Sequence, residues 1–207
     1  MVFTGIVEKT GIVTEIVHSK NLSKFTVQTS TEFCQGINIG ASVCVDGVCL
    51  TICTIDKDKL KFDIMMETLS VTTFDAIKED DIVNIERSMK LGDEIGGHLL
   101  SGHVSSTVKI SNIETPENNH ILTFQTSSDV LKYIFPKGYV ALNGVSLTIG
   151  EVDKVKKTFN VYLIPETLRL TNLQNKLVGN RINIEIETQT RNMVDTISEI
   201  NKESIHG

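Results

Sequence analysis

Short runs in which apolar and polar residues alternate fill much of the chain, and turn-forming residues separate them. Alternation with a period of two residues is typical of strands with one buried face. Many short strands at close spacing indicate a β-barrel or a β-sandwich. In the first half the predicted strands are Phe25–Gln28, Ser42–Val45, Val48–Ile55, Lys59–Ile64 and Ile82–Glu86. The pattern therefore predicts an all-β fold.

Two tight hairpins are predicted at corresponding places in the two halves. Asp46-Gly47 and Asn143-Gly144 each lie between apolar runs. These dipeptides favour a type I′ turn, which needs a positive φ at both central residues. Cys49 follows the first turn at the distance at which Ser146 follows the second.

The chain repeats itself at an offset of about a hundred residues. The octapeptide VDGVCLTI (45–52) returns as LNGVSLTI (142–149), with five of eight residues identical. Further pairs, at offsets of 97 or 99, are Thr4–Val7 with Ser101–Val104, Glu67–Leu69 with Glu166–Leu168, and Asn84–Glu86 with Asn183–Glu185. Chance similarity between strand sequences is a poor explanation, because the matches keep their order. We expect two units, 1–97 and 98–187, with Met89–Gly97 as the linker between barrels.

Beyond residue 187 the apolar period changes. Apolar positions now recur at steps of four and three, which predicts one amphipathic helix over 188–207. Its stripe consists of Met193, Ile197 and Ile200, with Ser204 as a further position. The stripe can pack on the chain's own barrels or form a short helical bundle between subunits, and its narrow spacing favours the bundle.

Composition narrows the function classes. The net charge is −6, and the 20 Lys and Arg residues are scattered, so nucleic acid is not an expected partner. The N-terminus has no basic segment followed by a long apolar run, and no stretch is long enough to cross a bilayer. We expect a soluble, cytoplasmic protein with no membrane partner.

The four cysteines are not arranged as a metal site. No C-x-x-C or H-E-x-x-H spacing occurs, so no metal is expected. Cys49 and Cys53 would lie ~13 Å apart along one strand, which is beyond disulfide reach. Cys44 and Cys49 could face each other across the turn, but a cytosolic compartment would keep them reduced.

Five segments resemble the riboflavin synthase family of the α-chain type and occur in the order found in that family. Along the chain they are Phe3–Val7, the hairpin around Cys49, Gly92–Val104, the hairpin around Ser146, and Leu163–Leu168. The resemblance covers essentially the whole chain. It implies two tandem Greek-key six-stranded β-barrels plus a C-terminal α-helix, and a homotrimer formed through those helices.

The resemblance also implies the reaction. Two molecules of 6,7-dimethyl-8-ribityllumazine become riboflavin and 5-amino-6-(D-ribitylamino)uracil, without a metal or redox cofactor. A four-carbon unit moves from one copy of the substrate to the other, so a repeated barrel suits the chemistry. The working site is expected between the N-terminal barrel of one subunit and the C-terminal barrel of its neighbour.

Two sets of substrate contacts follow from the resemblance. The first comprises Gly5, Ile6, Val7, Cys49, Leu50, Thr51, Asp63, Ile64, Met65, Met66, Glu67 and Thr68, with Gly102, His103 and Val104 reaching in. The second comprises Lys137, Ser146, Leu147, Thr148, Tyr162, Leu163, Ile164, Pro165, Glu166 and Thr167. Thr4, Ser42 and Glu187 complete the expected contacts. Thr hydroxyls and strand-edge backbone groups can pair with a uracil-like edge, and Glu67 and Glu166 can accept bonds from ribityl hydroxyls.

Four residues are candidates for the chemistry. His103 and His98 could carry protons near neutral pH, because one lumazine must lose a proton from its C7 methyl group. Cys49 could add to C7 of the other lumazine or position a water that does so. Ser146, the weaker nucleophile, would orient a ligand. Each also has a structural interpretation, since a strand Cys is often a small apolar residue and a loop His often only bonds locally.

The chain departs from the family pattern at four positions. Val2 is inserted before Phe3, Asp46 replaces the usual Asn, Ser70 stands where Arg is common, and Glu187 stands where Asp is common. Glu187 is one methylene longer than Asp, so whether its carboxylate reaches Ser146 stays open.

The main alternative is a non-catalytic lumazine- or flavin-binding protein of the same fold, similar to the antenna proteins of luminous bacteria. Those proteins have lost parts of the segment around the two histidines or of the second pocket. This chain keeps His98, Ser101, His103, Ser146 and Thr148, which favours the enzyme. A barrel that binds proteins and no small ligand is a more distant alternative.

Overall fold

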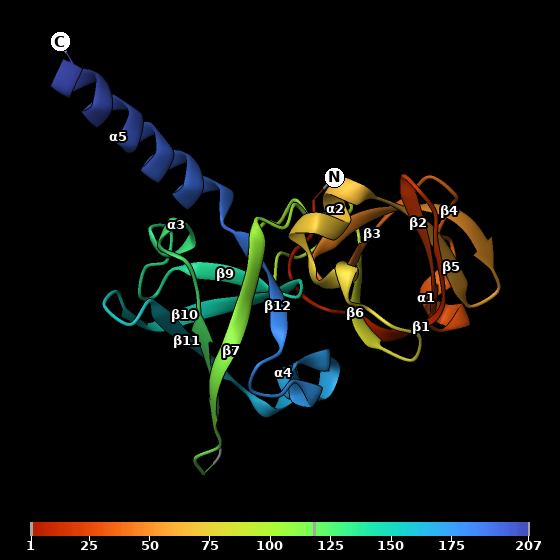
Figure 1. Cartoon of the computed structure of the whole chain (residues 1–207). Helices are drawn as coiled ribbons and strands as arrows, with labels where there is room; N and C mark the ends of the chain where they lie inside the picture. The colour runs from red at the N-terminus through yellow and green to blue at the C-terminus, as the bar shows by residue number, and fades with distance from the viewer. Residues whose placement is uncertain (1, 118, 207) are drawn as a thin grey trace.

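Two closed six-stranded β-barrels stand side by side, and one long helix projects from the second (Figure 1). The computed structural model describes residues 2–117 and 119–206, with side chains as far as residue 202. The first barrel consists of β1 (Lys9–His18), β2 (Leu22–Gln28), β3 (Ser42–Val45), β4 (Val48–Asp56), β5 (Lys59–Met65) and β6 (Ile82–Arg87). The second consists of β7 (Ser106–Glu114), β8 (His120–Gln125), β9 (Tyr139–Leu142), β10 (Val145–Asp153), β11 (Thr158–Leu163) and β12 (Arg181–Ile186). The helical elements are α1 (Thr31–Cys34), α2 (Met66–Val71), η1 (Thr73–Asp75), α3 (Ser128–Leu131), α4 (Pro165–Leu170), η2 (Asn172–Asn175) and α5 (Thr188–His206).

Both barrels are antiparallel Greek keys. In the first barrel hairpins join β3, β4 and β5, and β6 returns to lie beside β3. The second barrel repeats this order with β9, β10, β11 and β12. A fourth strand that returns beside the first of three consecutive strands defines the Greek key. The predicted all-β fold with two tandem six-stranded barrels and a C-terminal helix is confirmed.

The strand irregularities also repeat, as expected for a duplicated unit. A β-bulge adds one unpaired residue and bends the strand. The register shifts fall between Val13 and Glu15 in β1, Ile110 and Asn112 in β7, Ile52 and Thr54 in β4, and Ile149 and Val152 in β10. Each shift in the first barrel therefore has a counterpart that begins 97 residues later in the second.

The five strands predicted in the first half are all present, but β1 was not predicted. The shift at Thr14 interrupts the alternation on which the prediction depended. Val13 is buried in the barrel core, whereas Ile12 and Val17 are both exposed. Apolar residues on the outer face of a bulged strand mask the two-residue alternation by which strands are predicted from sequence.

Both predicted hairpin turns have the expected backbone. The φ angles are 44° at Asp46 and 84° at Gly47, and 46° at Asn143 and 77° at Gly144. The two turns lie against each other at the seam between the barrels. A Cβ placed on Gly47 would lie 2.9 Å from the backbone N of Gly144, so these glycines permit the close approach of the barrels.

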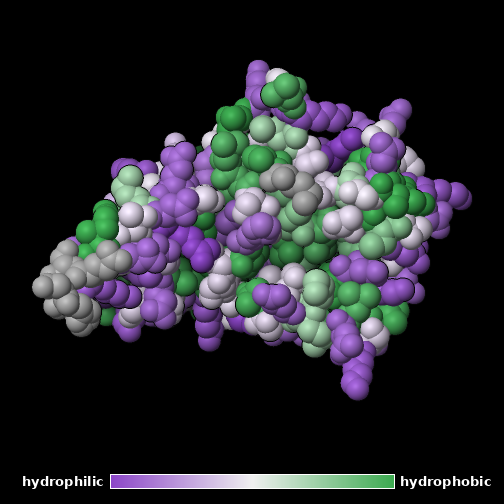
Figure 2. Space-filling view, turned by 90° about the horizontal axis from the view of Figure 1, so that it is seen from above, coloured by the Kyte–Doolittle hydropathy of each residue, from purple (hydrophilic) through white to green (hydrophobic). Residues whose placement is uncertain are grey.

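The C-terminal helix is confirmed as α5 and stands away from the barrels over most of its length (Figure 1). Near its start, Asp195 accepts a hydrogen bond of 2.6 Å from the Tyr133 hydroxyl of the second barrel. Met193, Ile197 and Ile200 are 66%, 53% and 55% exposed. Hydrophobic surface is visible on this helix and across the middle of the molecule (Figure 2). The side chain of Ser204 and residue 207 lie outside the described residues.

In the described part of the chain, no helix combines the length and the apolar character that crossing a membrane requires.

A buried hydrogen-bond network joins the barrels. The side-chain amide of Asn84 in β6 donates to the carbonyl of Asn143 in the second barrel's turn (2.9 Å). The amide of Asn183 in β12 donates to the carbonyl of Asp46 in the first barrel's turn (2.8 Å). Each turn is also held to its own barrel, because Asp46 Oδ1 accepts from Asn84 N (2.7 Å) and Asn143 Oδ1 accepts from Asn183 N (2.9 Å). All four residues are buried, so the network fixes how one barrel sits on the other.

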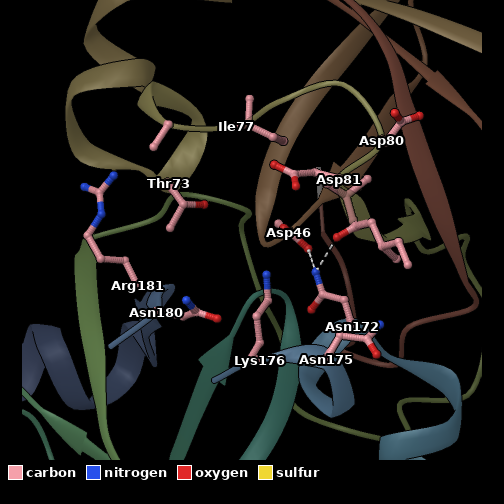
Figure 3. Close-up of a pocket in the computed structure, with 13 residues that line it drawn as sticks. Asp46, Thr73, Ile77, Asp80, Asp81, Asn172, Asn175, Lys176, Asn180 and Arg181 are labelled. Atoms are coloured by element: carbon pink, nitrogen blue, oxygen red, sulfur yellow. Dashed lines mark hydrogen bonds between the residues drawn. The ribbon is translucent and has the colours of Figure 1, made fainter. Parts of the chain in front are cut away.

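Asp46 breaks the symmetry of this network. Its Oδ1 also accepts a hydrogen bond of 2.9 Å from the side chain of Asn172, beside a cavity of about 550 Å³ (Figure 3). Burial raises the pKa of Asp46 from 3.8 to about 6, although Lys176 and the bonds from Asn84 and Asn172 favour the ionised form. The mirrored residue, Asn143, carries no charge at any pH.

Asp46→Asn should weaken the pH dependence of stability. Because the folded pKa of Asp46 lies above 3.8, the folded state holds this proton more tightly than the unfolded chain does. Its contribution is therefore greatest below about pH 4 and is lost as the pH rises through about 6. We compare the free energy of unfolding of the variant with that of the parent at each pH. The variant should gain on the parent between pH 5 and pH 8, by about 1 kcal/mol or more. Urea unfolding at the two pH values measures this.

The reverse change, Asn143→Asp, is the matched control in the mirrored turn. It should make stability fall more steeply between pH 5 and pH 8. Unchanged pH profiles in both variants would contradict the role assigned to the seam carboxyl.

Candidate active site

Two extended segments, one before each barrel, run antiparallel across the seam. Phe3 N donates to Leu100 O, and Leu100 N donates to Phe3 O, both at 2.9 Å. Both side chains are buried. The two residues occupy corresponding positions in the repeat, 97 residues apart, so this pair lies on the approximate two-fold axis of the molecule.

Each segment then reaches the opposite barrel. Gly5 O accepts from Ser146 N of β10 (2.8 Å), and Gly102 O accepts from Cys49 N of β4 (2.9 Å). Val7 lies in the core of the second barrel, and Val104 packs against the core of the first. The structure therefore forms one half-site from β4 and residues 101–104, and a second half-site from β10 and residues 4–7.

This exchange corrects the expected grouping of contacts. Gly5 and Val7 were expected in the set with Cys49, but they lie with Ser146 and the second barrel. Gly102 and Val104 do lie with the first barrel, as expected. Sequence order suggested the wrong grouping for the N-terminal segment because the segment crosses the seam before β1 begins.

The crossing segments require glycine at their closest approach. Gly5 and Gly102 have φ angles of 74° and 75°, in the left-handed region. A Cβ would lie 2.6 Å from the Ser146 Cβ at Gly5 and 2.5 Å from the Cys49 Cβ at Gly102. Both the backbone conformation and the lack of space exclude a side chain here.

Two buried glutamates anchor the segments, and the sequence did not mark them as site residues. Glu86 Oε1 accepts from Thr4 N (2.7 Å) and Thr4 Oγ1 (2.8 Å), and Oε2 accepts from Gly5 N (3.1 Å). Glu185 accepts in the same way from Ser101 N, Ser101 Oγ and Gly102 N at 2.7, 2.8 and 3.0 Å. The repeated Asn-Ile-Glu at 84–86 and 183–185 was the available signal.

Burial sets the ionisation of these anchors. It raises the pKa of Glu86 to about 7, against the bonds from Thr4 and Gly5, which favour the carboxylate. It also raises the pKa of Glu185, while Ser101, Gly102 and the nearby His103 favour the ionised form. Because both oxygens of each glutamate accept backbone N–H bonds, the carboxylate is the form that satisfies all the donors.

The first half-site centres on Cys49. Its thiol is partly buried, lies beside Ser42 and faces Cys44 across the hairpin. Burial raises the pKa of the Cys49 thiol, although the hydrogen bond with Ser42 lowers it. The thiol is therefore protonated near neutral pH, which disfavours direct attack by a thiolate. His103 is exposed, and its backbone N donates to Ser101 Oγ (3.2 Å).

The second half-site centres on Ser146 and His98. The Nδ1 atom of His98 lies 2.6 Å from Ser146 Oγ, and the imidazole stacks on Tyr139 with ring centroids 5.3 Å apart. Burial lowers the pKa of His98, although Glu187 opposes this shift, so the ring is neutral near pH 7. Its Nε2 is buried and has no hydrogen-bond partner among the described residues. The structure thus brings His98 to Ser146, while His103 lies on the segment beside Cys49.

Most of the remaining expected residues lie where a strand end runs into a short helix, β5 into α2 in the first barrel and β11 into α4 in the second. Glu166 is exposed and bonded to Arg169, and Ser70, at the position matching Arg169, donates to the carbonyl of Glu67 (2.7 Å). Four of the remaining expected residues lie in the barrel cores, Leu50 and Ile64 in the first and Leu147 and Leu163 in the second. Exposed are Thr51, Asp63, Met65, Met66, Glu67, Lys137, Thr148, Tyr162, Ile164, Pro165 and Glu166, and partly exposed are Thr68, Thr167 and Glu187.

Cavities coincide with the expected site only in part. Thr4 and Ile6 line a cavity of about 490 Å³ together with Glu86, and Ser42 lines one of about 130 Å³. The seam cavity of about 550 Å³ contains none of the expected site residues. Among the residues that the structure describes, no group of three or more His, Cys, Asp or Glu side chains suits a metal ion.

The backbone carbonyl of Val2, the inserted residue, accepts a hydrogen bond of 2.9 Å from Met89 N.

Comparison with known proteins identifies similar chains. The model of the lumazine binding domain family matches twice, at residues 4–88 and 101–187. The chain is 43% identical over 199 residues to the riboflavin synthase of Escherichia coli strain K12, covering 96% of this chain and 92% of that one. It is 42% identical over 198 residues to the riboflavin synthase of Chlamydia pneumoniae, covering 96% of each.

A solved structure has the same fold as this chain. LumP in complex with riboflavin superposes with a TM-score of 0.82 at 24% identity, covering 90% of this chain and 100% of that chain.

Gly102→Ala should cost more stability than Gly36→Ala. Gly36 has nearly the same φ, 70°, but a Cβ there would meet nothing within 4 Å. Both variants carry the left-handed backbone cost, and only Gly102→Ala adds a clash with Cys49. We expect losses of unfolding free energy of about 2–4 kcal/mol for Gly102→Ala and about 1–2 kcal/mol for Gly36→Ala. Urea unfolding compares them, and equal losses would show that the segment does not press on β4 in solution.

Proposed function

The chain belongs to the riboflavin synthase family, and we propose that it transfers a four-carbon unit between two molecules of 6,7-dimethyl-8-ribityllumazine. The products are riboflavin and 5-amino-6-(D-ribitylamino)uracil. Relatives named riboflavin synthase match nearly the whole chain at 42–43% identity. The observation that carries the proposal is the pair of half-sites, each built from a hairpin strand of one barrel and the leading segment of the other.

This duplication fits a reaction between two copies of one molecule. Both half-sites present the same kinds of backbone group, and each lies in a barrel with the same run of strand end into short helix, so each can hold the same heterocycle. They differ in side chain where the chemistry needs a difference. Cys49 stands in the first half-site where Ser146 stands in the second, and only Ser146 has a buried histidine on its hydroxyl.

We assign acid–base work to Ser146 with His98 at the second half-site, and to His103 near Cys49 at the first. A neutral imidazole can accept a proton, and His98 is neutral at pH 7. General acid–base catalysis typically contributes about 10²–10⁴-fold, whereas orienting two reactants can remove ~7–11 kcal/mol of the barrier. Positioning of the two lumazines is therefore the larger contribution.

The functional unit is proposed to be a cytoplasmic homotrimer in which lumazines meet between subunits. Within one chain, the Phe3–Leu100 pair and the two hairpin turns occupy the axis between the half-sites. This supports pairing a half-site with that of a neighbouring chain. The exposed apolar stripe of α5 offers a surface for such assembly. All four cysteines are thiols, which fits a reducing compartment.

The reaction itself is the direct test. Purified protein incubated with the lumazine should produce riboflavin, seen by its absorbance, with two lumazines consumed for each riboflavin formed. An antenna-type protein would bind the lumazine and change its fluorescence without forming riboflavin. A barrel that binds no small ligand would change nothing. Either of these results would overturn the proposed function.

Ile197→Glu should break the assembly and lower activity together. A charge in the apolar stripe of α5 would be buried without a partner in a helical bundle. Asn192→Glu is the matched control, since it adds the same charge to an exposed position of α5 outside the stripe. We expect at least about tenfold lower turnover, from lost positioning, for Ile197→Glu only. Light scattering measures the mass, and a fully active Ile197→Glu monomer would contradict a site between subunits.

A further inference from the structure

Cys44 and Cys49 form a cross-strand pair next to the first half-site. In the β3–β4 hairpin, Val45 faces Val48 across the two-residue turn, and Cys44 faces Cys49 in the next pair. The pair that closes such a turn exchanges hydrogen bonds, so the next pair does not. Consistent with this, Cys49 N donates outward to Gly102 O.

The backbone geometry of this pair suits a disulfide. Residues opposite each other in a non-hydrogen-bonded antiparallel pair have Cα atoms about 4.5 Å apart, and their side chains lie on the same face. A disulfide spans Cα separations of about 4.4–6.8 Å. The two thiols can therefore be bridged without moving either strand far.

The two thiols differ in access. Both pack in one apolar cluster with Phe3, Leu100 and Ala141. Cys44 is only 2% exposed, whereas Cys49 is partly exposed on the half-site. A small reagent in solution therefore reaches Cys49 first, and Cys44 is reached only through Cys49.

We propose that Cys44 and Cys49 are a dithiol modification site, which a low-molecular-weight disulfide such as oxidised glutathione converts to an intramolecular disulfide that stops turnover. Cys49 loses its proton and attacks one sulfur of the glutathione disulfide, forming a mixed disulfide and releasing one glutathione. Cys44 then loses its proton and attacks the Cys49 sulfur, which releases the second glutathione. Two protein thiols are oxidised and one glutathione disulfide is reduced.

The effect on turnover follows from the position of Cys49 and rests on the proposed function. In the disulfide, the Cys49 sulfur is bonded to Cys44 on β3 and no longer carries a thiol hydrogen that can bond with Ser42 or with a substrate. The second barrel cannot respond in this way, because Ala141 and Ser146 occupy the matching positions. Since the reaction needs both half-sites, blocking the first is enough.

The surroundings of the two thiols make their oxidation slow at neutral pH. Burial raises the pKa of Cys49, and it raises the pKa of Cys44 well above 9.0. Thiol–disulfide exchange needs the thiolate, so oxidation should accelerate as the pH rises. Cys53 is exposed farther along β4 and can form only a mixed disulfide, because its Cα lies ~13 Å from that of Cys49 along the strand.

The test uses full-length protein carrying Cys53→Ser, so that the exposed thiol does not add glutathione. Reduced protein is incubated with oxidised glutathione at pH 7.0 and pH 8.5, denatured, alkylated and analysed by mass spectrometry, with turnover measured in parallel. We expect loss of two hydrogen atoms per chain, protection of Cys44 and Cys49 from alkylation, faster reaction at pH 8.5, and turnover that falls with the oxidised fraction and returns with dithiothreitol.

Cys44→Ala, in the same Cys53→Ser background, is the matched variant, since alanine is the natural residue at the corresponding position 141. It should fold, keep its turnover when reduced, and carry at most one glutathione on Cys49. The dithiol proposal is refuted if, in protein that retains both Cys44 and Cys49, glutathione stays attached to Cys49 or Cys44 remains open to alkylation. If the disulfide forms but turnover is unchanged, the proposed loss of turnover is refuted. Failure of the reduced protein to form riboflavin would instead refute the proposed function, while the mass result still decides the dithiol.

Discussion

The exchange of leading segments across the seam is the constraint on which the rest of the structure depends. Each barrel is closed by its own six strands, but each half-site borrows a segment that begins in the other half of the chain. Gly5 and Gly102 press directly on Ser146 and Cys49, so the position of one barrel sets the shape of the other barrel's half-site. The seam must therefore be rigid, because looseness there would displace both half-sites at once.

Rigidity at the seam comes from buried polar groups rather than from a shared apolar core. The two barrels have separate cores, and among the described residues the one apolar cluster apart from these cores is the small one around Phe3 and Leu100. Asn84, Asn183 and the two glutamates instead fix the geometry through bonds of defined direction. Such groups are costly to bury, and they tolerate few alternative arrangements because a shifted barrel would leave them without partners.

Local patterns in the sequence were enough to predict an all-β fold, both type I′ turns and the C-terminal helix, and the repeat predicted two units. The alternation left a barrel and a sandwich open, and the resemblance to the family implied the two six-stranded barrels. Local patterns were not enough to predict β1, where the bulge at Thr14 interrupts the alternation. Nor could they show that Gly5 lies on Ser146, because a crossing of the seam leaves no local trace in composition or period. The buried roles of Glu86 and Glu185 likewise depend on contacts with residues more than eighty positions away.

The duplicated frame explains why the two halves can differ where they do. Backbone contacts hold both half-sites in matching geometry, so a side chain can change in one half without disturbing the other. Three such differences lie in the two equivalent hairpins: Asp46 corresponds to Asn143, Cys44 to Ala141, and Cys49 to Ser146. A reaction that uses two copies of one molecule in unlike roles needs this combination, since the frame must treat the copies alike while the side chains must not.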